Sequence, residues 1–151
     1  MPGGDPSALN KLMNDPARTY LNFLVTRSQK ARWVASVCEG AMLLAKAGLL
    51  DGYNVTTHWA FIPCLKKFPA IKVAKGHPRF VIDRNRITGG GISSGLDEAL
   101  KLVELLSSNE VARQVQQNIQ YYPRPPVKSK IPKPQGCPLE NPARTIRCAT
   151  R

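Results

Sequence analysis

The sequence lacks the features of a membrane-spanning or secreted chain. No apolar run approaches the roughly 20 residues that a helix needs to cross a bilayer. Residues 1–9 contain neither the basic segment nor the apolar stretch of a signal peptide. We therefore expect a soluble, cytoplasmic protein with no membrane partner.

Cysteine is scarce and widely spaced. The thiols belong to Cys38, Cys64, Cys137 and Cys148, and no two of them form a Cys-x-x-Cys pair. This spacing matches neither a zinc site nor the dense disulfide framework of a small secreted fold. We expect reduced thiols and no metal, with Cys64 serving as a packing residue on a helix.

Acidic residues are few, at 10 against 22 Lys and Arg, which leaves a formal charge of +12. Residues 123–151 hold seven basic side chains and one acidic, so they carry +6 of this charge. The other basic residues are scattered and not interleaved with aromatic side chains, so we expect no nucleic-acid partner. Seven prolines in 123–151 predict an extended, mobile basic tail after a domain at 1–122.

The ordered part alternates short β-prone runs with helix-forming runs. Asp5-Pro6 and Asp15-Pro16 each place a capping side chain before a proline, so helices are expected to begin there. The second should run to about Lys30 with Tyr20, Phe23 and Leu24 facing inward. Further helices are predicted at 40–47, 59–68, 94–106 and 110–120, and strands at 33–37, 53–57, 71–74, 80–82 and 87–88. The alternation indicates an α/β fold with a mainly parallel sheet.

One of these helices, at 94–106, has apolar residues at helical spacing. They predict a single inward face, made of Leu96, Ala99, Leu100, Val103 and Leu106.

The most informative position is Cys38. An apolar strand ends at this cysteine, and the small residue Gly40 opens a helix two places later, which is the pattern of a nucleophile elbow. Free amides and the dipole at a helix start favour the thiolate, and the amide of Glu39 would serve as an oxyanion-hole donor. The alternative is a buried cysteine that packs as a small hydrophobic residue. The spacing alone leaves both possibilities open.

Several segments occur together in a characteristic order. They are SVCEGA at 36–41, AGLLDG at 47–52, VTTHW at 55–59, ITGGGISSGLD at 87–97 and IQYYPRPP at 119–126. This series resembles the ThiJ/PfpI superfamily, which has a class I glutamine amidotransferase-like fold, and most closely its isonitrile hydratase branch. The resemblance implies a doubly wound, flavodoxin-like, three-layer sandwich with helices on both faces of the sheet. It also implies a homodimer that acts on a small electrophilic molecule without a cofactor.

The resemblance assigns roles to particular residues. Cys38 matches the nucleophile, and the Pro2-Gly3-Gly4 loop matches the loop whose amide is a second oxyanion donor. His58 falls where relatives keep a histidine near the nucleophile, although an ordinary histidine at a strand end explains it equally well. The implied reaction is attack of the Cys38 sulfur on an isonitrile carbon, then hydrolysis of the thioimidate to an N-substituted formamide.

Two departures from the family pattern bear on activity. Glu39 stands where the hydratase branch has threonine, and its carboxylate would oppose thiolate formation if it turned inward. The resemblance begins at the family's third strand, so we expect an N-terminally truncated domain without the acidic partner of the nucleophile. Activity of this chain alone is therefore doubtful.

Three other functions fit the same resemblance. They are a glyoxalase- or deglycase-like enzyme, a redox-sensing or chaperone protein, and a non-enzymatic sensor domain of the kind found in transcription regulators. Regulators need a helix-turn-helix module after this domain, and residues 123–151 are too short and proline-rich to form one.

Overall fold

The structure, a computed structural model, describes residues 1–140, so the expectation for Cys148 lies outside the described residues. Its main sheet has three strands in the order β1 (Val34–Ser36), β5 (Arg86–Gly89) and β4 (Phe80–Asp83). β1 and β5 run parallel, and β4 is antiparallel to β5. A second, parallel pair joins β2 (Asn54–Val55) to β3 (Lys72–Val73). The strands are therefore mixed in direction, with β4 departing from the expected parallel arrangement.

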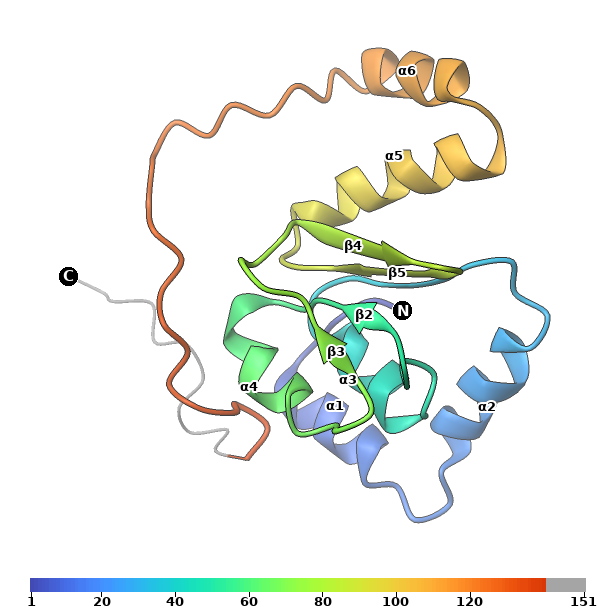
Figure 1. The fold of residues 1–151 in the computed structure, drawn as a ribbon, viewed down its shortest axis with the longest axis vertical. Coiled ribbons are helices and arrows are strands. Elements are labelled where there is room, and N and C mark those ends of the chain that lie inside the picture. The colour runs from blue at the N-terminus through green and yellow to red at the C-terminus, as the bar shows by residue number, and fades with distance from the viewer. Residues whose placement is uncertain (141–151) are drawn as a thin grey trace.

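Helices lie on both sides of the strands (Figure 1). One side carries α5 (Ser94–Leu106) and α6 (Asn109–Asn118). The other side carries α1 (Pro6–Met13), α2 (Thr19–Ser28), α3 (Gly40–Lys46) and α4 (Ile62–Leu65), which follows a 3-10 turn at Trp59–Phe61. This layering confirms the predicted flavodoxin-like α/β fold. Within residues 1–140, no helix has both the length and the apolar character needed to span a bilayer.

An aspartate side chain precedes each of the first two helices, but only the first helix is capped by it. The Asp5 carboxylate accepts hydrogen bonds from the amides of Ser7 and Ala8, as expected for the start of α1. α2 begins later than predicted, at Thr19. The Asp15 side chain, which lies outside the helix, accepts a hydrogen bond from the Thr19 amide, and Arg18 adopts a left-handed conformation with φ 52°. Residues that the Asp15-Pro16 pattern placed in α2 therefore form the turn between the two helices.

The predicted inward face is confirmed in part for α2 and is largely wrong for α5. In α2, Tyr20 and Leu24 pack against the core as predicted, but Phe23 is 51% exposed and the fully buried residue is Leu21. In α5, Leu96 and Leu106 are about half exposed, whereas Ser94 and Glu98 are buried. α5 packs through these polar positions because Gly89 of β5 leaves room for the Glu98 carboxyl: a Cβ on Gly89 would lie 1.4 Å from Glu98 Oε1.

The core lies around α3, whose residues from Gly40 to Ala45 are all buried. It packs against β2, the 3-10 turn and α4 on one side and against α1 and α2 on the other. A fully buried leucine stabilises a fold by about 1.5–3 kcal/mol. The helix that follows Cys38 is therefore fixed by packing at every residue except its last, Lys46.

The C-terminal segment returns to the domain after α6. It has no helix or strand from 121 to 140, and it runs back from α6 toward α4 and α1 (Figure 1). Cys137 forms a disulfide with Cys64, a core residue of α4 that is 2% exposed. The expectation of reduced thiols is therefore wrong for these two residues. They are 73 residues apart, so the pairing depends on the path of the tail.

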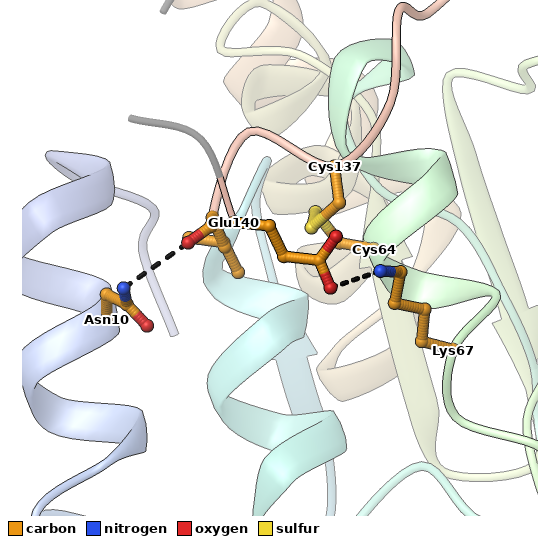
Figure 2. The surroundings of a disulfide bond; sticks show 6 residues. Asn10, Cys64, Lys67, Cys137 and Glu140 are labelled. Atoms are coloured by element: carbon orange, nitrogen blue, oxygen red, sulfur yellow. Dashed lines mark hydrogen bonds and ion pairs between the residues drawn. A yellow bond between two sulfur atoms is a disulfide. The ribbon is translucent and has the colours of Figure 1, made fainter. Parts of the chain in front are cut away.

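The non-covalent attachments of this segment are weak (Figure 2). Lys67 pairs with Glu140, but both side chains are more than half exposed, and such pairs contribute at most about 1 kcal/mol. Asn10 Nδ2 donates a long hydrogen bond of 3.3 Å to the Leu139 carbonyl. Ordering the backbone of one residue costs about 1–2 kcal/mol, so these contacts alone do not hold several residues in place. The disulfide, together with the half-buried Leu139 that packs against the core, holds the segment in place.

Gly40 provides a direct test of how α3 is positioned. A Cβ on Gly40 would lie 2.4 Å from the Met1 carbonyl oxygen and 2.6 Å from that of Pro2, so backbone would have to move. We expect Gly40→Ala to lower the free energy of unfolding in urea by about 1–3 kcal/mol, even though alanine favours helix. Gly4→Ala is the matched control, because nothing lies within 4 Å of its Cβ. Equal stabilities of the two variants would contradict this packing.

Candidate active site

Cys38 occupies the sharp turn between β1 and α3. Its φ is 58°, a left-handed conformation that costs a non-glycine residue about 1–2 kcal/mol. The Thr57 hydroxyl donates a hydrogen bond of 2.7 Å to the Cys38 carbonyl, and the Gly40 amide donates one of 3.0 Å to the Val37 carbonyl. Strained residues of this kind are concentrated at functional sites. The turn has the geometry expected of a nucleophile elbow.

The start of the chain lies directly beside this turn. The Met1 carbonyl accepts a hydrogen bond of 3.0 Å from the Val37 amide, which places the following loop against the elbow. A Cβ on Gly3 would lie 3.2 Å from the Cys38 Cβ and 2.8 Å from Glu39 Oε2. Gly4 is exposed and has open space around it. The structure thus brings Gly3, but not Gly4, against the cysteine.

A pocket of about 480 Å³ opens at the elbow. Three of the residues singled out in the sequence, Cys38, Glu39 and His58, line it together. Its other walls are largely apolar and come from distant parts of the chain, namely Pro6, Phe61, Ile92, Ser93 and Pro138. The pocket therefore joins a potential nucleophile, a carboxyl group and an imidazole to a surface suited to an apolar substituent.

The Cys38 thiol is not activated in the way the sequence suggested. Burial, hydrogen bonding by the Glu39 carboxyl and the Glu39 charge raise the pKa of Cys38 to about 12, against a smaller lowering effect of the Glu39 backbone amide. The expectation of a thiolate near neutral pH is wrong, because Cys38 is only 8% exposed and the Glu39 carboxyl group turns inward. Cys38 is a protonated thiol at neutral pH.

The Glu39 side chain turns inward, to the pocket, and not to solvent. Its Oε2 atom is buried and has no hydrogen-bond partner among residues 1–140. A buried polar atom without a partner is costly, so this oxygen is available to accept a hydrogen bond from a ligand. Glu39 therefore brings to the site a carboxyl group as well as its backbone amide.

His58 makes a structural hydrogen bond and also borders the pocket. It caps the 3-10 turn at Trp59–Phe61, where its Nδ1 accepts a hydrogen bond of 3.3 Å from the Ala60 amide. Burial lowers the pKa of His58, against an opposing effect of the Glu39 charge, so the ring is neutral and we assign its proton to Nε2. The ring also borders the pocket, and Gly91 passes close by: a Cβ there would lie 3.6 Å from His58 Cδ2.

Some neighbours of the site were missed by the sequence analysis. Ile92 and Ser93 follow the glycine run, so their place near the elbow could have been inferred, but Pro138 lies in a segment with no pattern. Glu98 is 2% exposed, burial raises its pKa to about 7, and its charge is a small further cause of the raised pKa of Cys38. Residues 1–140 contain no cluster of three or more His, Cys, Asp or Glu side chains that could hold a metal ion.

Comparison with known proteins identifies relatives of this chain. The DJ-1/PfpI family model matches residues 1–105. An isonitrile hydratase from Pseudomonas putida is 41% identical over 132 residues, which cover 87% of this chain and 55% of that protein. The HTH-type transcriptional regulator GbdR of Pseudomonas aeruginosa is 38% identical over 87 residues, covering 57% of this chain and 23% of the regulator.

A solved structure shows the same architecture. The crystal structure of a ThiJ/PfpI family protein from Pseudomonas syringae matches with a TM-score of 0.70 and 38% sequence identity. The match covers 78% of this chain and 47% of that one. The chain therefore spans about half the length of the hydratase and of this solved structure.

The protonation state of the Cys38 thiol can be measured by its rate of alkylation with iodoacetamide. Because only the thiolate reacts, and because the pKa is about 12, the rate should rise about tenfold per pH unit between about pH 7 and 9. Glu39→Gln should accelerate the reaction at pH 8, because it removes the carboxylate that raises the pKa. Mass spectrometry of the Cys38 peptide separates this thiol from Cys148.

The matched control is Glu110→Gln, which removes an exposed carboxylate on α6. It should leave the rate unchanged. A rate that levels off near pH 8, or slower alkylation in Glu39→Gln, would contradict the assigned state of the thiol.

Proposed function

Since this chain belongs to the DJ-1/PfpI family, we propose that it is a cysteine-dependent lyase that adds water to an isonitrile and releases an N-substituted formamide. The observation that carries this proposal is the left-handed Cys38, held at a strand-to-helix turn and facing a pocket with Glu39 and His58. The 41% identity to an isonitrile hydratase supports this choice of substrate. Cys38 is the nucleophile in this account.

The first step requires a base beside the sulfur, because a thiol with a pKa of about 12 is protonated at neutral pH. The Glu39 carboxylate is placed to take this proton as the sulfur bonds to the isonitrile carbon. The same carboxyl group then delivers the proton to that carbon, which has gained an electron pair. The S–H group has thereby added across the carbon, and the product is a thioimidate on Cys38.

The second step consumes water. Water adds to the thioimidate carbon, the nitrogen gains a proton, and the C–S bond breaks, so the electron pair and a proton return to the Cys38 sulfur. The neutral His58 carries its proton on Nε2, so it acts as a hydrogen-bond donor to the substrate rather than as a base. The amide of Glu39 and an amide of the Gly3-Gly4 loop would bind the oxygen of the tetrahedral intermediate.

The pocket favours a particular class of substrate. Its walls at Phe61, Ile92 and Pro138 are apolar, whereas its polar groups gather at Cys38. An isonitrile with an apolar substituent on nitrogen would place its reactive carbon at the sulfur and its substituent against these walls. The reaction needs no metal or organic cofactor.

The alternatives differ in how well the site supports them. A peroxide-sensing role for Cys38 is disfavoured, because oxidation requires an accessible thiol of low pKa. A glyoxalase-like reaction would use the same nucleophile, so only an activity assay distinguishes it from isonitrile hydration. The regulator match covers 57% of this chain and supports a sensor domain less well than the hydratase match supports an enzyme.

The remaining expectations stay predictions. They are the homodimer, the cytoplasmic location, and the division into a domain at 1–122 and a tail at 123–151. Exposed apolar side chains on α5 and α6, such as Leu106 and Val111, would suit a dimer contact. A disulfide persists poorly in a reducing cytosol, so a cytoplasmic protein would form the Cys64–Cys137 bond only transiently.

The proposal is tested by measuring formamide production from an N-alkyl isonitrile by the chain as it stands. Cys38→Ala should reduce turnover by at least about a hundredfold, because the covalent route is lost. Glu39→Gln should also slow turnover, although it accelerates alkylation, because the proton carrier is gone. Glu110→Gln should retain full activity.

The outcomes separate the candidates. Formamide production that survives Cys38→Ala would remove this residue from its role. No formamide from the wild-type chain, together with turnover of a small dicarbonyl compound, would replace the hydratase with the glyoxalase-like enzyme.

A further inference from the structure

The C-terminal segment contributes directly to the Cys38 pocket. Pro138 lines this pocket together with Cys38, although the two residues are a hundred positions apart. The residue before Pro138 is Cys137, which is bonded to Cys64. We call residues 137–140 the strap. The disulfide of the strap is therefore one residue away from Pro138, the residue of the strap that forms a pocket wall.

The other end of the disulfide is also close to the pocket in sequence. The helical segment 59–65 begins at its cap His58, contributes Phe61 to the pocket, and carries Cys64 three residues later. The disulfide thus joins one pocket wall, at His58 and Phe61, to another wall, at Pro138. Breaking it would disconnect these two walls.

Besides the disulfide, the strap has three attachments, and the two polar ones are drawn in Figure 2. They are the exposed Lys67–Glu140 pair, the long hydrogen bond from Asn10, and the contact of the half-buried Leu139 with the core. Before the strap, nearly all of residues 123–136 are exposed. The previous firm contact of the chain is the hydrogen bond of 3.0 Å from the Tyr121 hydroxyl to Asp97. The position of Pro138 therefore depends on the disulfide.

We propose that the strap is a removable wall of the Cys38 pocket, and that reduction of the Cys64–Cys137 disulfide opens the pocket to bulkier ligands. This inference rests on the proposed function only in taking that pocket as the substrate site. With the disulfide formed, Pro138 limits the size of the group that accompanies the reacting carbon. After reduction, the strap is released and this limit is removed.

The reductant is a dithiol. One of its thiolates attacks Cys137 Sγ, because Cys137 is partly exposed whereas Cys64 is buried. The S–S bond breaks, and Cys64 leaves with the electron pair and takes up a proton. The second thiol of the reductant then displaces Cys137 from the mixed disulfide. Two electrons and two protons pass to the protein, and the reductant becomes a cyclic disulfide.

The test compares two reagents with the same reactive group and different sizes, iodoacetamide and iodoacetanilide, in their rates of Cys38 alkylation. The ratio of the larger to the smaller reagent is measured in the oxidised chain and after dithiothreitol treatment and gel filtration. We expect reduction to raise this ratio about tenfold, by removing one wall of the pocket. The Cys38 peptide is quantified by mass spectrometry, so the newly freed thiols do not interfere.

Three variants isolate the cause. Cys137→Ser should give the high ratio without reductant. Pro138→Gly keeps the disulfide but removes the ring from the wall, so it should also raise the ratio. Glu140→Gln loses the surface pair and should behave like the oxidised wild type. If Cys137→Ser fails to fold, as judged by circular dichroism, Pro138→Gly and the reduced wild type decide the question.

An equal ratio in the oxidised chain, the reduced chain and Pro138→Gly would overturn the proposal. Because alkylation requires no turnover, the two proposals fail separately. A chain that makes no formamide but shows the change in ratio loses the hydratase function and keeps the removable wall. A chain with hydratase activity and a constant ratio loses only the removable wall.

Discussion

The site depends on one constraint, the left-handed backbone at Cys38. A non-glycine residue pays about 1–2 kcal/mol for this conformation, so its surroundings must impose it. They do so through the Thr57 hydrogen bond to the Cys38 carbonyl and through the burial of α3 immediately after the turn. The same constraint explains why positions 3 and 40 are glycines: neither Gly3 nor Gly40 has room for a Cβ beside the elbow.

Local features of this fold could be predicted from the sequence, and distant ones could not. The strand before Cys38, the turn at Gly40 and the alternation of strands and helices are encoded by neighbouring residues. The buried side of α5 escaped prediction because it packs through Glu98, into space left by Gly89. The Cys64–Cys137 bond and the place of Pro138 in the pocket depend on the path of an unpatterned tail, which no local spacing specifies.

The pKa of Cys38 shows how one side chain can reverse a positional argument. A helix start favours a thiolate, but burial of the sulfur and the adjacent Glu39 carboxyl outweigh that effect. Burial is the larger cause of the raised pKa, and the contribution of Glu39 depends on its rotamer, which the sequence leaves open. In the reaction proposed for this site, the proton would therefore move within a Cys38–Glu39 pair as the bond to carbon forms, because the sulfur does not start as a thiolate.

The central claim is that the Cys38 sulfur bonds to the carbon of the substrate. It is tested most directly by mixing the protein with an N-alkyl isonitrile, quenching with acid, and mapping the modified peptide by mass spectrometry. The account predicts a mass increase equal to one isonitrile on the Cys38 peptide, which is absent in Cys38→Ser. An unmodified Cys38 peptide in a sample that is producing formamide would contradict it.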